Sequence, residues 1–495
     1  MRISGLTSGI DIDSIVQSLM QSHKTPVTKL QKQSMKIEWQ QDAYRSVSTS
    51  LVDFRNNKLS NYSLLSSIDA KKAEISGDNT TAVSATASGS TSAGVYHVKV
   101  ERLASAAQST ITTNITGAAA TAKFSEAGTI NINGKDISYT KDDTFESLIS
   151  KINQDKDANV TAIYSQTNGK LSLTSKTTGG GAIEVDSRFN ALIGASNWNN
   201  VAGQTAKASV NGVDVESATN QLSVNGLSIQ LKTIHSGTSS STITVSTDTD
   251  KILSTIKSFV SDYNSLIESI NTKLGEDRYR NYDPLTDEEK EAMTDKQVEL
   301  WESKAKSGLL KNDSILSSLV SNMRTATTAT FHYGTNEQNE PNKVTIQSIG
   351  ITTGQWYEGG KLFIDEEKLK AALDEDPNKV IGLLTAGSTV SSSNANVVTD
   401  TNLGIFHKLS ALVMDSLVNL SDKAGTSRTS TSITGSFLEN SLLSQQKKNI
   451  TTRISDLNAK LLNLETQYYK KFTAMETALN KYNSQAASIS SYTSF

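Results

Sequence analysis

Apolar residues near the amino terminus recur with the spacing of amphipathic helices. Ile15 and Leu19 share one face of a segment that follows Asp11 and Asp13, and either aspartate can cap a helix. Pro26 fits the first turn of a second helix. From there, apolar residues return at the spacing of a heptad seam, which predicts a helix that pairs with another along its length. The residues of this seam are Leu30, Ile37, Tyr44, Val47, Leu51 and Phe54.

A longer apolar stripe occupies the last part of the chain. Its first members alternate steps of four and three residues, which is the a/d spacing of a coiled coil. The spacing then lengthens after Leu464, and such a stutter locally unwinds a left-handed supercoil. The stripe consists of Ile450, Ile454, Leu457, Leu461, Leu464, Tyr468, Phe472, Met475, Leu479 and Tyr482.

Two interpretations of this stripe remain open at the level of sequence. The helix can be buried inside its own domain, or it can pair with the amino-terminal seam and with neighbouring chains. The position of both seams at the chain ends favours the second interpretation, because termini otherwise tend to fray.

Between residues 73 and 248 the pattern changes to the alternation of half-buried strands. Asn-Gly turns at 133–134 and 168–169 predict two hairpins. Between them lies a short predicted helix, with Asp143 as N-cap and Glu146 three residues later. The buried face predicted for this helix is Phe145, Leu148, Ile149 and Ile152.

Helical spacing returns after Asp250. Two capping-box patterns follow, Thr286 with Glu289 and Thr294 with Gln297, and each predicts the start of a helix. The apolar residues that carry the helical spacing of the first segment are Ile252, Ile256, Phe259, Tyr263, Leu266 and Ile270.

Further helices are expected around 313–330 and 404–420, and the polar segment 387–402 between them is predicted to be a loop or linker. The order of elements predicts a nested, multidomain α+β fold. The expected parts are a coiled-coil-like helical leg from 1–44 and 450–495, a helical domain from 45–72 and 249–449, a β-rich domain from 73–104 and 205–248, and an inserted β-rich domain with one short helix at 105–204.

Composition narrows the range of functions. The 495 residues carry 48 Lys and Arg against 51 Asp and Glu, a formal net charge of -3, which gives no basic excess for binding nucleic acid. Cysteine is absent, so no disulfide or thiolate site can form. No cleavable signal peptide and no membrane-spanning apolar run is expected, and neither nucleic acid nor membrane insertion is predicted.

Candidate catalytic chemistry is sparse. The five histidines are isolated, and no paired metal-ligand spacing, nucleophile elbow or P-loop occurs. Asp248 and Asp250 lack the glycine and terminal glutamate of an EF-hand, and helix capping is the simpler interpretation. We therefore expect no enzyme activity, no cofactor and no metal. The histidines, expected at the surface or partly buried, are His23, His97, His235, His332 and His407.

Five segments, in this order, resemble the FliD family of flagellar filament cap proteins. They are "ISGLTSGIDIDSIVQSLM", "YHVKVERLASAAQS", "TFESLISKINQDKDANVTAIYSQTNGKLSLTS", "YDPLTDEEKEAMTDKQVELWESKAKSGLLKND" and "YYKKFTAMETALNKYNSQ". The third is similar to a repeat shared by flagellin-related axial proteins, and the fourth is the most distinctive. His23 and Lys24 depart from the family, where an acidic residue is common before the proline.

The resemblance implies a homo-oligomeric ring at the distal tip of the flagellum, outside the cell, that helps exported flagellin fold and insert and prevents its loss. It also implies export through the flagellar type III channel, contact with hook-filament junction proteins, and a cytosolic export chaperone on the carboxy-terminal segment. A surface adhesin that binds host glycans through the outer β domains is the alternative, and flagellin itself is a third.

The residues expected to form the protein-interaction seam come from both ends of the chain. They are Ile15, Leu19, Leu30, Ile37, Ile450, Ile454, Leu457, Leu461, Leu464, Met475 and Leu479. No catalytic, cofactor-binding or metal-binding residue is predicted beside them.

Overall fold

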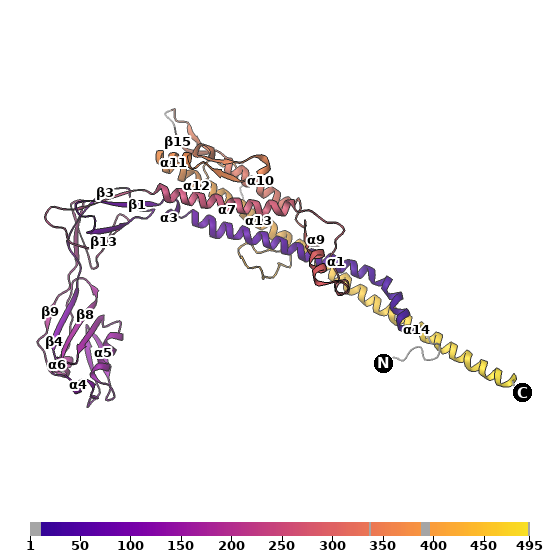
Figure 1. The fold of residues 1–495 in the computed structure, drawn as a ribbon, viewed down its shortest axis with the longest axis horizontal. Helices are drawn as coiled ribbons and strands as arrows, with labels where there is room; N and C mark the ends of the chain where they lie inside the picture. The colour runs from indigo at the N-terminus through magenta and orange to yellow at the C-terminus, as the bar shows by residue number, and fades with distance from the viewer. Residues whose placement is uncertain (1–10, 336–337, 388–396, 494–495) are drawn as a thin grey trace. The chain divides into compact units, whose positions relative to one another are not determined.

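A computed structural model describes residues 11–335, 338–387 and 397–493 of the chain (Figure 1). The chain divides into two compact units, one of residues 1–64 and 253–495 and one of residues 65–252. Part of the first family-like segment, residues 3–10, and most of the predicted loop 387–402 lie outside the described residues.

The first unit is mainly helical. Helix α1 runs from one end of it, α14 returns antiparallel beside α1, and α7, α10 and α13 complete the bundle (Figure 1). Its main helices are α1 (Ile12–Asp53), the π-helix η1 (Phe54–Leu59), α2 (Ser60–Tyr62), α7 (Thr249–Gly275), α8 (Asp287–Glu291), α9 (Asp295–Lys306), α10 (Ser314–Thr328), α13 (Ile405–Ala424) and α14 (Leu442–Thr493).

The prediction that Pro26 starts a second helix is wrong, because α1 is continuous and contains Pro26 in its interior. A proline there removes one backbone hydrogen bond and is unfavourable by about 3 kcal/mol. Buried side chains on both sides of it, Met20 before and Val27 after, hold the two halves of α1 against the rest of the unit. Tertiary packing therefore outweighs the local preference for a break.

The two predicted capping boxes are confirmed. The hydroxyl of Thr286 accepts from the Glu289 N–H at the start of α8, and that of Thr294 accepts from the Gln297 N–H at the start of α9. The expected helices around 313–330 and 404–420 are α10 and α13.

A polar network ties three helices of this unit together. The Tyr44 hydroxyl on α1 donates to Oδ2 of Asp313 at 2.7 Å, and the Lys423 ammonium on α13 lies 2.6 Å from the same oxygen. The other carboxylate oxygen, Oδ1, accepts from the Leu316 N–H and caps α10. Burial disfavours the charge on Asp313, but the hydrogen bonds from Lys423 and Tyr44 hold the pKa of this carboxyl below its usual value.

Between α10 and α13 the chain forms a group of short elements that the sequence pattern did not predict. Asp376 caps α12 and Pro377 occupies its first turn, which is a favourable place for proline. These elements are β15 (Phe331–Thr335), β16 (Pro341–Val344), η2 (Ile346–Ile349), β17 (Ile351–Thr353), η3 (Trp356–Glu358), β18 (Leu362–Ile364), α11 (Glu366–Glu375) and α12 (Pro377–Thr385).

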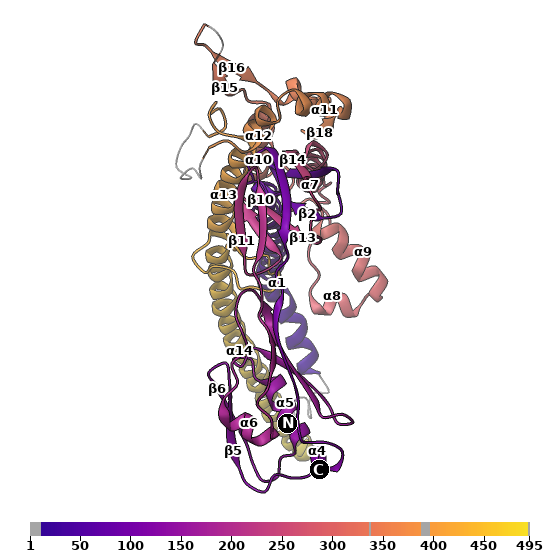
Figure 2. The same cartoon turned by 90° about the vertical axis from the view of Figure 1, so that its left-hand side faces the viewer.

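The second unit contains one sheet assembled from strands that are far apart in the sequence. Its order is β1-β14-β3-β10-β11, with every pair antiparallel, and a three-stranded sheet β12-β13-β2 shares its apolar core (Figure 2). The unit begins with α3 (Leu65–Ile68). The strands are β1 (Lys71–Gly77), β2 (Val83–Thr86), β3 (Gly94–Arg102), β10 (Ala206–Val210), β11 (Val213–Ser217), β12 (Gln221–Val224), β13 (Leu227–Leu231) and β14 (Ser241–Thr247).

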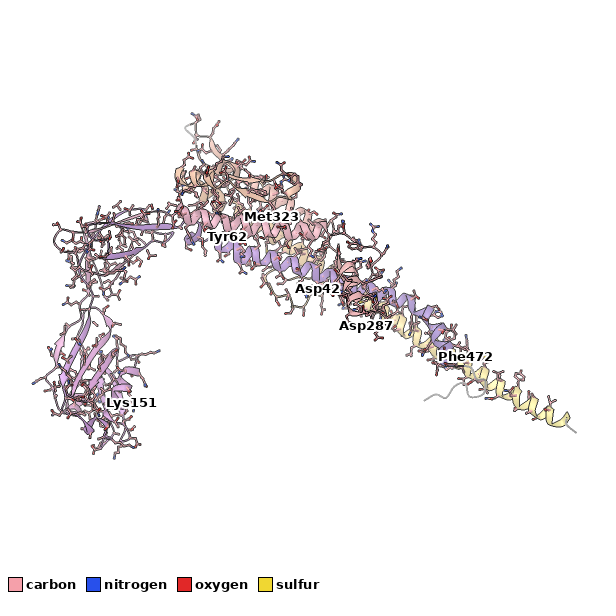
Figure 3. The ribbon with its side chains drawn as sticks, in the orientation of Figure 1. Asp42, Tyr62, Lys151, Asp287, Met323 and Phe472 are labelled. Carbon is pink, nitrogen blue, oxygen red and sulfur yellow. The ribbon has the colours of Figure 1, made fainter. Side chains whose placement is uncertain are left out.

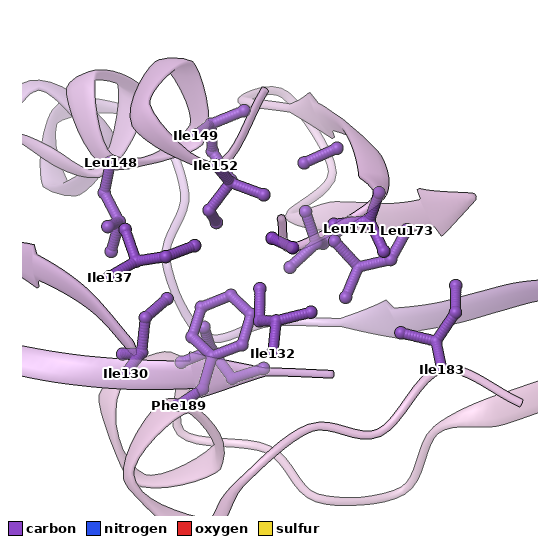
Figure 4. Packing of buried hydrophobic residues seen from close by; sticks show 14 of the residues in the cluster. Ile130, Ile132, Ile137, Leu148, Ile149, Ile152, Leu171, Leu173, Ile183 and Phe189 are labelled. Carbon is purple, nitrogen blue, oxygen red and sulfur yellow. The ribbon is translucent and has the colours of Figure 1, made fainter. Parts of the chain in front are cut away.

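The segment between β3 and β10 forms a module with its own core (Figure 4). Its main sheet has the order β7-β8-β4-β9, and both predicted hairpins are confirmed as β5–β6 and β7–β8. Its elements are β4 (Ala106–Thr112), α4 (Ala118–Thr121), β5 (Gly128–Ile132), β6 (Lys135–Tyr139), α5 (Phe145–Gln154), β7 (Val160–Ser165), β8 (Lys170–Thr178), α6 (Ser187–Ile193) and β9 (Asn199–Val201).

The short predicted helix is α5, and its four predicted core residues are buried. Its predicted cap is wrong. Thr144 is the N-cap and pairs with Ser147 in a capping box, while Asp143 accepts from the Ser147 hydroxyl and contacts the Lys151 ammonium at 2.6 Å. The Asp143 carboxylate therefore stabilises the first turn of α5 from a position just before the helix.

Candidate protein-interaction site

The two terminal helices pair antiparallel. Ile12, Val16 and Met20 of α1 are buried, and they pack against half-buried residues of α14. The α14 partners are Leu461, Leu464, Tyr468, Tyr469 and Phe472, and Figure 3 marks Phe472 at the end of this contact. Farther along the pair, the Lys447 ammonium lies 2.6 Å from the Glu38 carboxylate. The α14 stripe therefore packs on α1 of its own chain.

The amino-terminal part of the predicted seam is turned away from this contact. Ile15 and Leu19 are 37% and 40% exposed, and the buried face of α1 is displaced by one residue toward Ile12, Val16 and Met20. Both faces of α1 carry apolar residues in the sequence, and the position of α14 decides which face is buried.

The remaining predicted seam residues fall into three groups by burial. Leu30 is buried, and Met475 and Leu479 are exposed. The half-buried group is Ile37, Ile450, Ile454, Leu457, Leu461 and Leu464. The antiparallel pair therefore covers the stripe only as far as Phe472.

Beyond Phe472, α14 carries apolar side chains with little cover. Met475 is 39% exposed, Leu479 38%, Tyr482 68% and Ile489 64%. Isolated helices are marginal in water, and an amphipathic face is normally stabilised by packing. This stripe therefore lacks the apolar packing that normally stabilises such a face.

Where α1 passes the α7–α10 connection, a groove of about 320 Å³ opens beside α14. Three apolar residues line it, Ile37, Leu309 and Ile450, together with the cationic side chains of Lys36 and Arg278. Two of the predicted seam residues, Ile37 and Ile450, thus lie in a surface depression.

The α7–α10 connection is held on α1 by ion pairs and ring contacts. The Lys32 ammonium lies 2.6 Å from Oε1 of Glu289, and the Lys306 ammonium lies 4.7 Å from the centre of the Trp39 ring. Burial opposes the charge on Glu289, but the hydrogen bonds from Lys32 and from the Thr286 N–H lower the pKa of this carboxyl. The Glu289 carboxylate is therefore charged at neutral pH, which favours its ion pair with Lys32.

Two kinds of site, metal centres and membrane-spanning helices, were sought in the part of the chain that the structure describes. In these residues, no group of three or more His, Cys, Asp or Glu side chains is placed to hold a metal ion. Within the same residues, no helix combines the length and the apolar character of a membrane span.

The fold and this site define the class as a multidomain α+β structural protein with uncovered apolar helix faces. The family profile for the C-terminus of flagellar hook-associated protein 2 matches residues 203–484, and the N-terminal profile matches residues 8–107. The chain therefore belongs to the flagellar hook-associated protein 2 family. The profile named flagellin hook IN motif matches residues 126–177, inside the inserted module. The family is structural and is not a family of enzymes.

Relatives and solved structures agree with this assignment. Flagellar hook-associated protein 2 of Halalkalibacterium halodurans is 29% identical over 557 residues, covering 99% of each chain. The protein of the same name from Escherichia coli K12 is 28% identical and covers 83% of this chain and 88% of its own. The D1-D2-D3 domains of the E. coli flagellar cap protein FliD share the fold, with a TM-score of 0.52, 22% identity and coverage of 83% of this chain and 99% of that one. None of these names supports the adhesin alternative.

Proposed function

We propose that this protein caps the flagellar filament. Copies of the chain form a ring at the distal tip, outside the cell, where the ring promotes the folding and insertion of exported flagellin and prevents its loss. The similar E. coli protein bears the name flagellar cap protein, which supports this assignment.

The observation that carries the proposal is the exposed stripe of α14 formed by Met475, Leu479 and Tyr482. Full burial of one such side chain stabilises an interface by about 1.5–3 kcal/mol. Each copy in a ring presents the same stripe, so the contribution repeats with every subunit. We propose that the terminal helices, the predicted leg, make contacts between copies or with flagellin.

The partners follow from the same assignment. They are flagellin, further copies of this chain, the neighbouring hook-filament junction proteins, and a cytosolic export chaperone that binds the carboxy-terminal segment. Export through the flagellar type III channel requires the chain to pass unfolded, and its lack of cysteine suits that route because no disulfide can form on the way.

The substitution Leu479→Asp tests the proposal. It places a charge on the uncovered stripe and leaves the described packing of the chain unchanged. We expect a normal thermal melt, release of flagellin monomer into the medium and loss of filaments in electron micrographs. Asn480→Asp is the matched control, because it adds the same charge at the next, exposed position.

Export of each variant must be verified by blotting the medium, since the proposed chaperone binds the same carboxy-terminal segment. If exported Leu479→Asp protein supports filaments of normal length, the stripe is not an assembly surface. If Asn480→Asp abolishes filaments as well, charge alone is responsible and the apolar stripe does not carry the function.

A further inference from the structure

The segment that joins α13 to α14 is a long loop, residues 425–441, which contains neither helix nor strand. Connections in compact domains are usually about 4–6 residues long, and loops longer than about 12–15 residues are mostly functional or disordered. This α13–α14 loop has a fixed path beside α1, because a side chain of α1 holds it. Its length therefore points to a function.

Arg45 of α1 holds the middle of the α13–α14 loop. Its Nη1 donates to the Ile433 carbonyl at 3.0 Å, and its Nη2 donates to the Gly435 carbonyl at 2.8 Å. The guanidinium also lies 3.7 Å from the centre of the Phe437 ring, which is a cation–π contact. The loop is thus ordered before any partner arrives, and this lowers the entropic cost of binding one.

Although the loop is held in place, its apolar side chains remain uncovered. Ile433 is 67% exposed and Leu438 is 54% exposed. The loop has two charged residues, and the first, Arg428, is paired with Asp422 of α13 at 2.9 Å. The second is Glu439, which is exposed and directly follows Leu438. The end of the loop therefore presents an apolar side chain next to a negative charge.

The groove of about 320 Å³ beside α14 has the complementary chemistry. Its lining contains two cationic residues, Lys36 and Arg278, and none of the described residues that line it is acidic. Lys36 already lies 3.8 Å from the Asp283 carboxylate, whereas Arg278 is exposed on the α7–α10 connection. The apolar residues of the lining are Ile37, Leu309 and Ile450. A leucine followed by a carboxylate fits such a lining.

We propose that the α13–α14 loop of one copy docks in this groove of a second copy of the chain. Leu438 enters the groove, and the Glu439 carboxylate pairs with the Arg278 guanidinium. The inference rests on the proposed capping function and deepens it, because it names two surfaces that join the copies of the ring. An apolar anchor in a pocket, with complementary charge at its edge, is an arrangement that fixes the position of a partner.

The placement of the two surfaces favours a second copy as the partner. Both belong to the helical unit, and in Figure 2 the α13–α14 loop extends on the side of α13, whereas α8 and α9 project on the opposite side. The groove lies at the base of the connection that carries α8 and α9, because Arg278 precedes these helices and Leu309 follows them. A contact between different surfaces of identical subunits repeats head to tail and can close into a ring.

Sedimentation velocity of the full chain over a range of concentrations measures the association. Arg278→Glu places two acids at the contact and should weaken association at least about tenfold, because like charges across an interface repel. Glu439→Arg should do the same by placing two cations there. The double variant restores opposite charges and should associate as the unmodified chain does. Arg280→Glu, at an exposed position outside the groove, is the matched control and should have no effect.

Leu438→Asp tests the apolar half of the contact and should also weaken association. Thr431→Asp adds the same charge at another exposed position of the loop and should leave association unchanged. Leu438→Asp leaves the groove intact, and Arg278→Glu leaves the loop intact. An equal mixture of these two variants should therefore form pairs that neither variant forms alone.

Each contrary result has a distinct meaning. If the unmodified chain associates and the single variants associate equally well, the contact is wrong while the ring of copies stands. If the double variant fails to restore association, Arg278 and Glu439 do not face each other and the contact is overturned. Loss of filaments in cells that carry Arg278→Glu, with self-association unchanged, would make another protein the occupant of the groove and overturn the second copy. An unmodified chain that stays monomeric at every concentration would overturn both the contact and the ring.

Discussion

The module between β3 and β10 and the end of α14 are both built from amphipathic elements, but they cover their apolar residues in different ways. In the module, Phe145, Leu171 and Phe189 have no exposed surface. Along α14, none of the described side chains after Leu443 is fully buried. A closed core stabilises a module by itself, whereas a half-covered helix depends on what binds to it.

The largest loss of stability is expected when a buried side chain of the module core is truncated. Phe145 on α5 is fully buried and packs edge-on against Tyr164 at a centroid distance of 4.9 Å. Phe145→Ala should destabilise the module by about 3–5 kcal/mol, because truncation of a buried phenylalanine leaves a cavity. Hydrogen exchange of the full chain should accelerate in β4–β9 and remain unchanged in α14.

The control for this variant is Ile163→Ala in the same module, at a side chain that is 66% exposed. It should change stability by less than about 0.5 kcal/mol. The fragment 105–204 is also predicted to melt cooperatively, since its core residues all lie inside it. A broad melt of the fragment, or equal effects of the two substitutions, would contradict an independent core.

The same two regions show what sequence patterns can predict. The hairpins, the buried face of α5 and the capping boxes of α8 and α9 were predictable because each depends on residues within one or two turns of the chain. The cap of α5 was missed because Asp143 and Thr144 are both good caps. In the structure the Asp143 carboxylate contacts the Lys151 ammonium, while the Thr144 hydroxyl accepts from the Ser147 N–H.

Features set by distant contacts could not be predicted in this way. The continuity of α1 through Pro26 and the choice of Ile12 over Ile15 for its buried face both depend on neighbours elsewhere in the chain. The small elements between α10 and α13 are too short for a periodic pattern. The predicted domain limits at residues 44 and 450 remain predictions, since α1 and α14 run through both positions without interruption.

An intermediate effect is expected where the two terminal helices touch. Leu461 is half-buried against the Ile12, Val16 and Met20 cluster. Leu461→Asp should weaken the pairing by about 1–2 kcal/mol, below the value for a fully buried leucine. Hydrogen exchange of residues 12–20 should accelerate, the melt of the β-rich unit should stay the same, and filament assembly should be reduced.

Leu462→Asp provides the matched control, because Leu462 is the next residue of α14 and is 65% exposed. It should leave exchange at 12–20 unchanged. If Leu461→Asp also leaves it unchanged, the helix pair is held by contacts other than this cluster.

The smallest effect, and the only one governed by pH, concerns a buried histidine of the β-rich unit. His235 is 5% exposed, which differs from the surface or partly buried position expected from sequence. Its Nδ1 accepts the Val100 N–H at 2.9 Å, so Nε2 carries the proton and donates to the Ser241 hydroxyl at 3.0 Å. Burial, with a smaller contribution from the charge of Lys99, lowers the pKa of His235 below its ordinary value of 6.5.

The sign of the pH dependence follows from this network. The unfolded chain binds a proton at His235 more readily than the folded chain, so the free energy of unfolding falls as the pH drops from above 6.5 toward the lower folded pKa. Hydrogen exchange of the Val100 amide between pH 7.5 and pH 5.5, corrected for intrinsic exchange, should reveal this loss of protection. His235→Gln keeps an acceptor and a donor without a titrating group and should flatten the slope. His97→Gln changes an exposed histidine of β3, the strand that contains Val100, and should leave the pH dependence intact. A slope that persists in His235→Gln would show that another group carries the pH dependence.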